Sequence, residues 1–178
     1  EIGTTRQGRT IWMYRLGDED LETAGGFPEH AMLSNGGIHA REWQSHEVAT
    51  GIMELIATSP DDQHLITYLR ENANVMVIPV LNVDGFLQTQ RYPRHNWLGT
   101  DPDDPDESPR DGRMRRKNMR ATVDEDLATA GDHLLGVDLN RNSAPYWASN
   151  PRRSSNDPDS LVHHGPSQAS EPETQALD

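Results

Sequence analysis

The stretch VMVIPVL, residues 75–81, is almost entirely apolar and decides how the fold is interpreted. A run this apolar is typical of a strand covered on both faces, as in the sheet of an α/β protein. Pro79 is the one residue in it that a central strand disfavours, because proline cannot donate to the strand ladder. The following residues 82–85 (NVDG) predict a turn that ends the strand.

Further elements are predicted on the N-terminal side of this strand. Aromatic and branched residues at 10–16 (TIWMYRL) predict a strand, and residues 31–34 (AMLS) predict a short buried one that ends at a glycine turn. Apolar residues at helical spacing predict a helix over 44–58. Ser59 and Pro60 then resemble the N-cap and first turn of a second helix that ends near residue 73.

The C-terminal side adds a predicted strand at 133–139 (HLLGVDL) and a capping box at 170–173 (SEPE), which predicts the start of a helix. Residues 93–112 are predicted to form a long acidic loop, because their Asp and Pro content argues against regular structure. Strands, helices and loops alternate, which favours the α/β class. We predict a single domain over residues 1–178, with a mixed, largely parallel central sheet flanked by helices.

Composition excludes several functions. The chain has 178 residues, a net charge of −13 and no cysteine. An acidic surface disfavours nucleic acid and anionic membranes, so we expect neither as a partner. Without cysteine there is no disulfide, thiolate nucleophile or cysteine-ligated metal. No apolar run is long enough to span a membrane, and the first residues do not resemble a signal peptide.

Residues 36–43 (GGIHAREW) contain the first candidate site. His39 and Glu42 are three residues apart, so on a first helical turn both side chains can point to one side. Imidazole nitrogen and carboxylate oxygen are normal zinc ligands. The strand end before them is where sites form in open α/β sheets. The alternative is an exposed His and Glu at a helix start.

Residues 136–142 (GVDLNRN) place three polar side chains at one predicted strand end. Asn140 and Arg141 could bind a carboxylate, Arg141 through its bidentate fork. Asp138 could accept the second ring N–H of a metal-bound histidine and so orient it. The alternative is a polar strand end with a solvated ion pair.

Arg116 lies in the basic run RMRRKNMR, residues 113–120. One arginine aimed into a cleft could stabilise an oxyanion. The alternative is a solvated basic face. A nucleic-acid patch is disfavoured, since the run is short, lacks interleaved aromatic residues and lies in an acidic protein.

Two other patterns are weaker. The acidic segment 101–107 (DPDDPDE) lacks the Gly and Glu spacing of a known calcium loop and is predicted to be solvated. His163 or His164 could be a metal ligand, but adjacent histidines in a loop are usually exposed.

Taken together, these pieces resemble the zinc metallocarboxypeptidases of the carboxypeptidase A/B type over nearly the whole chain. The motifs that carry the resemblance occur in order at residues 2–12 (IGTTRQGRTIW), 36–43 (GGIHAREW), 79–86 (PVLNVDGF), 115–118 (RRKN), 136–142 (GVDLNRN) and 165–177 (GPSQASEPETQAL).

The resemblance implies a role for each matching residue. His39 and Glu42 would be two ligands of one Zn²⁺, and Asp138 would accept the second N–H of His39. Arg116 would polarise the scissile carbonyl. Arg41, Asn140 and Arg141 would bind substrate, the last two at its C-terminal carboxylate.

The implied activity is removal of C-terminal amino acids from peptides or proteins by zinc-activated water. The family's third zinc ligand and general-base Glu have no counterpart in the chain, so we expect the N-terminal part of a longer catalytic domain, inactive by itself and incomplete on the C-terminal side of its sheet. A monomer, secreted or periplasmic, fits the family. The alternatives are a non-catalytic member of the fold that binds peptide carboxylates, and a zinc amidohydrolase that acts on cell-wall peptides.

Overall fold

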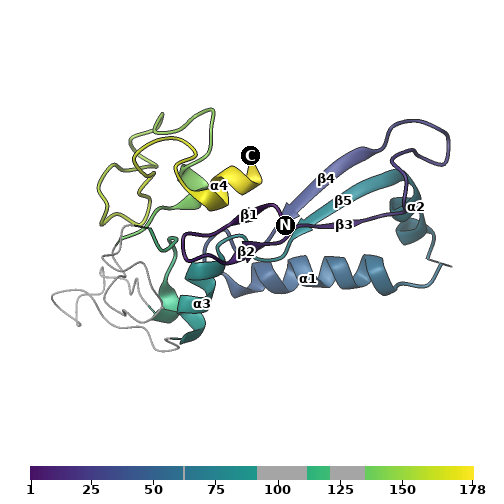
Figure 1. The fold of residues 1–178 in the computed structure, drawn as a ribbon, viewed down its shortest axis with the longest axis horizontal. Helices are drawn as coiled ribbons and strands as arrows, with labels where there is room; N and C mark the ends of the chain where they lie inside the picture. The colour runs from purple at the N-terminus through teal and green to yellow at the C-terminus, as the bar shows by residue number, and fades with distance from the viewer. Residues whose placement is uncertain (62, 92–111, 121–134) are drawn as a thin grey trace.

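The computed structural model describes residues 1–61, 63–91, 112–120 and 135–178. Its main sheet has three strands in the order β3 (Tyr14–Leu16), β5 (Ala73–Ile78), β4 (His30–Asn35). The centre strand β5 pairs antiparallel with β3 and parallel with β4, so the sheet is mixed (Figure 1). The α/β class predicted from the sequence is confirmed.

The apolar run that predicted a central strand forms the core. Val75 and Val77 of β5 are fully buried and pack against Ala49 and Ile56 of helix α1 (Trp43–Thr58). Helix α1 runs along the sheet, and α2 (His64–Asn72) leads back into β5 (Figure 1). Pro79 lies directly after β5, which removes the objection to a proline inside the strand.

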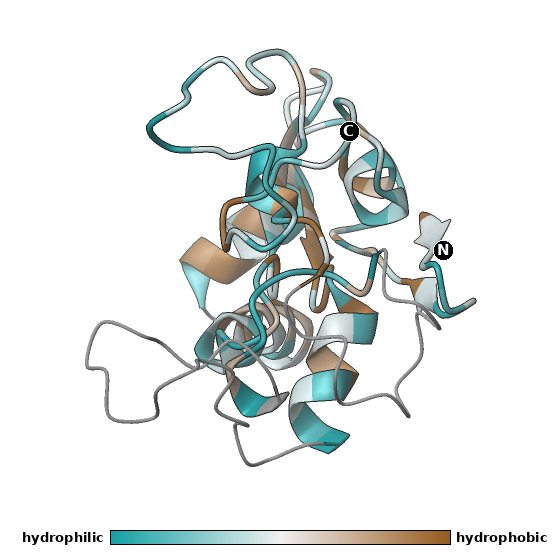
Figure 2. Cartoon of the chain, turned by 90° about the vertical axis from the view of Figure 1, so that its left-hand side faces the viewer, coloured by the Kyte–Doolittle hydropathy of each residue, from teal (hydrophilic) through white to brown (hydrophobic). Residues whose placement is uncertain are grey.

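A second core cluster lies around Ile11, Ile78 and Leu81. It joins the end of β5 to a small antiparallel pair, β1 (Gly3–Thr4) and β2 (Thr10–Ile11). The C-terminal helix α4 (Pro172–Leu177) packs beside this pair (Figure 1). In Figure 2 the strands at the centre are largely hydrophobic, while most outer loops are hydrophilic.

Three strand predictions need correction. Residues 10–16 form two strands in different sheets, β2 and β3, because the chain leaves one sheet for the other at residues 12–13. The strand at 31–34 exists as β4 but is not buried: it lies at the sheet edge, with Met32 49% and Leu33 45% exposed. Residues 135–138 form no strand and lead into the short 3-10 helix η2 (Leu139–Arg141).

Helix starts were also mispredicted. Residues 82–85 open helix α3 (Val83–Arg91), because the Asn82 side chain accepts a hydrogen bond from Gly85 N–H, as an N-cap does. Ser59 ends α1, and α2 begins five residues later. Helix α4 exists without the predicted capping box, since its N-cap is Glu171, whose side chain makes no capping hydrogen bond.

The acidic loop 93–112 falls outside the described residues, apart from Gly112, which opens the 3-10 helix η1 (Gly112–Met114). The solvated segment predicted at 101–107 lies outside them entirely. None of the helices in the described part of the chain is long and apolar enough to cross a membrane.

Candidate metal and carboxylate site

The site begins where β4 ends, at the glycine pair 36–37. Gly36 N–H donates to Ile78 O at 2.8 Å, and Leu81 N–H donates to Gly36 O at 3.0 Å, so the turn is fixed against the end of β5. Gly37 has φ +62, and a Cβ there would lie 1.8 Å from the His46 ring. Only glycine therefore fits at residue 37.

His39 and Glu42 lie in the turn that follows, just before α1 and not on its first turn as predicted. Glu42 N–H donates to His39 O at 3.1 Å, which folds the two side chains toward each other. His39 Nδ1 lies 2.9 Å from Glu42 Oε1. His39 is buried, whereas 48% of the Glu42 side chain is exposed, so the pair faces solvent on the Glu42 side.

Asp138 contacts the opposite side of the His39 ring, although the two residues are 99 positions apart. Its Oδ1 lies 3.1 Å from His39 Nε2, and its side chain is fully buried. Burial alone would raise the pKa of Asp138, but the hydrogen bond from His39 and the charge of Arg116 hold that pKa below its usual range. Asp138 is therefore an ionised acceptor that fixes the imidazole.

These contacts fit a cation beside His39. A neutral imidazole has one N–H, yet both ring nitrogens face carboxylate oxygens. If Nε2 donates to Asp138, the lone pair of Nδ1 points at Glu42, and only a proton or a metal ion between them relieves that contact. Imidazole nitrogen and carboxylate are a zinc donor set. Among the described residues, no third His, Asp or Glu joins this pair in a metal-binding group.

Arg116 completes the cluster. Its Nη2 donates to Asp138 Oδ2 at 2.9 Å, and its Nη1 lies 3.8 Å from Glu42 Oε1. Ala40 N–H donates to Arg116 O at 3.1 Å, which ties the arginine to the turn. The reading of this basic run as a solvated face is wrong here: Arg115 and Lys117 are buried, with Arg115 Nη2 bonded to Asn118 O at 2.6 Å.

Arg41 is held at the rim of the cluster. Its Nη1 lies 3.5 Å from Met114 O, and burial and the charge of Arg116 lower its pKa. Arg113 donates to Arg41 O at 3.4 Å and stacks 3.6 Å from the centre of the Trp43 ring. Sequence reasoning did not single out Arg113; its place beside Trp43 depends on contacts between distant segments.

Asn140 and Arg141 line a separate cavity of about 310 Å³. Arg141 Nε donates to Arg153 O at 2.8 Å, and its Nη1 donates to Asn140 O at 2.7 Å. Asn140 N–H donates to Asp138 Oδ1 at 3.0 Å, so this cavity and the His39 cluster share one short segment. The Arg141 Nη2 has no hydrogen-bond partner among the described residues.

A buried acidic pair supports the Arg116 segment and was not predicted. Asn118 Nδ2 donates to Glu171 Oε2 at 2.9 Å and to Glu173 Oε2 at 3.2 Å. Burial would raise the pKa of Glu171, but hydrogen bonds from Asn118, Ser170 and Arg120 hold that pKa low. Burial raises the pKa of Glu173 to about 7. Both glutamates belong to the segment SEPE, which predicts only a capping box and gives no local indication that they are buried.

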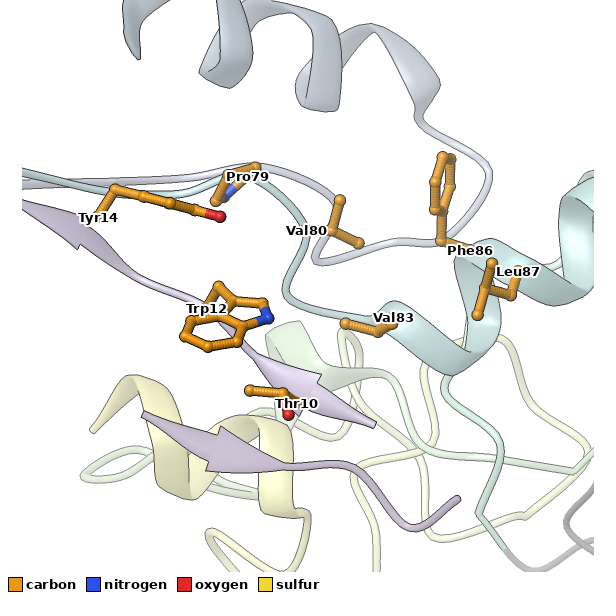
Figure 3. Close-up of a pocket in the computed structure, with 8 residues that line it drawn as sticks. All are labelled: Thr10, Trp12, Tyr14, Pro79, Val80, Val83, Phe86 and Leu87. Atoms are coloured by element: carbon orange, nitrogen blue, oxygen red, sulfur yellow. The ribbon is translucent and has the colours of Figure 1, made fainter. Parts of the chain in front are cut away.

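Two other features lie apart from this cluster. His164 is buried and packs edge-to-face on Trp147 at 4.8 Å, and neither it nor His163 belongs to a metal-binding group of the described residues. An apolar hollow of about 310 Å³ includes none of the predicted site residues (Figure 3). It is lined by Thr10, Trp12, Tyr14, Pro79, Val80, Val83, Phe86 and Leu87.

The fold and the candidate site together indicate a protein family. The chain belongs to the zinc carboxypeptidase family, whose model matches residues 1–178. This confirms the resemblance found in the sequence.

Individual relatives agree with this family. The chain is 29% identical over 177 residues to mast cell carboxypeptidase A of Rattus norvegicus, and 30% identical over 177 residues to carboxypeptidase B of Bos taurus. These matches cover 99% of this chain and 35% and 34% of the relatives. An inactive metallocarboxypeptidase, ECM14 of Arthroderma otae, is 29% identical over 96% of this chain and 24% of its own length. The chain thus spans about a third or less of these curated relatives.

Solved structures give the same result. Thrombin-activatable fibrinolysis inhibitor superposes with a TM-score of 0.71 at 25% identity, over 99% of this chain and 36% of that one. Carboxypeptidase A from Helicoverpa armigera superposes with a TM-score of 0.67 at 27% identity, over 99% and 35%.

Proposed function

We propose that the full-length protein is a zinc-dependent metallocarboxypeptidase that removes C-terminal amino acids from peptides. The observation that carries the proposal is the arrangement around His39, with Glu42 at one ring nitrogen and Asp138 at the other. Family membership supports it. His39 and Glu42 would hold the zinc. The bound metal supplies Lewis acidity and a water of lowered pKa.

The other residues would act on the substrate. Arg116, beside Glu42 and Asp138, would donate hydrogen bonds to the scissile carbonyl oxygen as negative charge develops on it. Asp138 would keep His39 in one tautomer and hold Arg116 in place. Asn140 and Arg141 would bind the substrate's C-terminal carboxylate, and Arg41 would contact the substrate further from the cut. The positive charge around the cavity that Asn140 and Arg141 line suits the negatively charged C-terminus of a peptide.

A test compares two peptides that differ only at the C-terminus, one a free acid and the other an amide. We expect the full-length protein to shorten the acid from its C-terminal end, to lose that activity with a zinc chelator, and to leave the amide uncut, because Arg141 has no carboxylate to bind. Arg141→Ala should raise KM for the acid about tenfold or more, the cost of a lost charge-assisted pair. Arg152→Ala, which removes an exposed arginine nearby, is the matched control.

A second candidate is a non-catalytic protein that binds peptide carboxylates, since one relative carries the name inactive metallocarboxypeptidase. Binding of the free acid without turnover by the zinc-loaded protein would favour it. Equal cleavage of acid and amide would contradict carboxypeptidase action, and cleavage of cell-wall peptides alone would favour the amidohydrolase.

A further inference from the structure

A second group of metal-type ligands lies at the other end of β4. Carboxylate oxygens of Asp18, Asp20 and Glu29 all lie within 4.8 Å of one another. The loop between β3 and β4 provides all three residues, and Glu29 directly precedes β4. His39 follows the opposite end of this strand, so the group is distinct from the candidate zinc site.

Glu29 makes this group more than a solvated acidic loop. Its side chain is 0% exposed, and neither carboxylate oxygen has a hydrogen-bond partner among the described residues. Burying an ionised carboxylate without hydrogen bonds is strongly unfavourable unless a charge compensates it. The two aspartates beside Glu29 add negative charge, which makes that cost larger.

Arg15 compensates for this charge only in part. Its Nη2 lies 4.0 Å from Glu29 Oε2, beyond hydrogen-bond distance. Its nitrogens bond elsewhere: Nε donates to Asn74 Oδ1, Nη1 to Asp18 O at 3.0 Å, and Nη2 to Asp20 O. Three carboxylates beside one guanidinium leave two negative charges, which one divalent cation neutralises.

We propose that Asp18, Asp20 and Glu29 bind a calcium ion. Calcium takes six to eight oxygen ligands and accepts carboxylates in one- or two-oxygen contacts, with water in the remaining positions. The group has no nitrogen or sulfur ligand, which disfavours zinc. Asp20 Oδ1 also accepts a hydrogen bond from Glu22 N–H at 2.8 Å, which fixes its direction. The ion would clamp the loop to the start of β4.

The first test is thermal unfolding of the full-length protein at constant zinc, in calcium chloride or in magnesium chloride of equal ionic strength. We expect calcium at millimolar concentration to raise Tm by roughly 5 °C or more, since a ligand that binds only the folded state stabilises it. Magnesium should raise Tm less. Calorimetric titration should give one calcium ion per chain at this site. No rise with calcium, or an equal rise with magnesium, would overturn the proposal.

Variants separate calcium binding from general charge effects. Glu29→Gln and Asp20→Asn should each weaken calcium binding at least about tenfold, because calcium affinity follows ligand charge. The matched control is Glu19→Gln, which removes the same charge from the same loop outside the group. Equal weakening in the control would contradict a specific site.

Without calcium, Glu29→Gln has a further expected result. The variant should be as stable as the parent chain or more stable, because it removes a buried charge that lacks hydrogen bonds. If Glu29 instead served only as an ion-pair partner of Arg15, the variant would lose stability in both conditions and calcium would have no effect on the parent chain. Failure of either test leaves the proposed peptidase function untouched, since the readouts do not involve activity.

Discussion

Asp138 is the residue on which the candidate zinc site depends. It is fully buried, and its two oxygens serve different partners: Oδ1 faces His39, and Oδ2 accepts two hydrogen bonds from Arg116. One carboxylate therefore orients both the proposed metal ligand His39 and the arginine proposed to act at the oxyanion. The sequence predicted that Asp138 could orient a metal-bound histidine, but only the family resemblance named His39, because nothing local in GVDLNRN indicates contact with a residue 99 positions away.

Asp138→Asn should weaken zinc binding by the full-length protein about 10- to 100-fold, as is typical when the hydrogen-bond partner of a metal-bound histidine is changed. The amide can present N–H to Arg116 or to His39, so at least one contact is lost. Competition with a metal-binding dye measures the affinity. His39→Ala should abolish tight binding, and Glu54→Gln, an exposed change on α1, should leave it unaltered. Unchanged affinity in Asp138→Asn would mean that Asp138 does not support a metal-bound His39, and unchanged affinity in His39→Ala would mean that His39 does not ligate the metal.

At the scale of elements, the turn between β4 and α1 positions the site. Residues 36–37 are held against the end of β5 by backbone hydrogen bonds, and the His46 ring on α1 fills the space where a side chain at residue 37 would lie. The sequence predicted the strand, the turn and the helix here. It placed His39 and Glu42 on the first turn of a helix, whereas both residues precede α1, which begins at Trp43. The ends of helices are the least certain part of such a prediction.

Gly37→Ala should lower the free energy of unfolding by about 2 kcal/mol or more, because an alanine at φ +62 is strained and its Cβ would overlap His46. Urea unfolding of the full-length protein gives the value. Gly51→Ala is the matched control: in the part of the chain that the structure describes, nothing lies within 4 Å of a Cβ added at this position in α1. It should stabilise the protein by roughly 0.5–1 kcal/mol. Equal effects of the two changes would contradict the close contact.

Over the whole molecule, buried carboxylates join distant segments. Glu173 of α4 bonds to Asn118 beside the Arg116 segment, and burial together with the charges of Glu171 and Asp84 raises its pKa to about 7. The pKa of Glu173 is therefore about 7 in the folded protein and about 4.5 in the unfolded chain. Its protonation in the folded state contributes fully to stability below about pH 4.5, and this contribution is lost as the pH rises through 7. Glu171 and Asp138 have lowered pKa values, so their contribution to the stability of the protein is lost only as the pH falls into the acid range.

Glu173→Gln should therefore flatten the stability profile of the full-length protein between pH 5 and pH 8. The variant should match the parent at about pH 5 and exceed it by up to about 3 kcal/mol at about pH 8, because a neutral amide avoids the cost of a buried charge. Urea unfolding across this pH range measures the difference. A parallel decline in both proteins would show that another group causes the loss.

Local patterns in the sequence determined the α/β class, the apolar strand at the centre of the sheet, helix α1, the glycine turn and the family, because apolar spacing and turn residues act over a few positions. Tertiary contacts decided the rest. The pairing of His39 with Asp138 and the hydrogen bonds of the buried Lys117 to Pro158 O and Ser160 O depend on segments far apart in the chain. The burial of the Glu29 side chain is likewise not indicated by local sequence. Charged residues are usually solvated, and only the surrounding fold shows that the buried Glu29 carboxylate lies beside the two exposed aspartates of its loop.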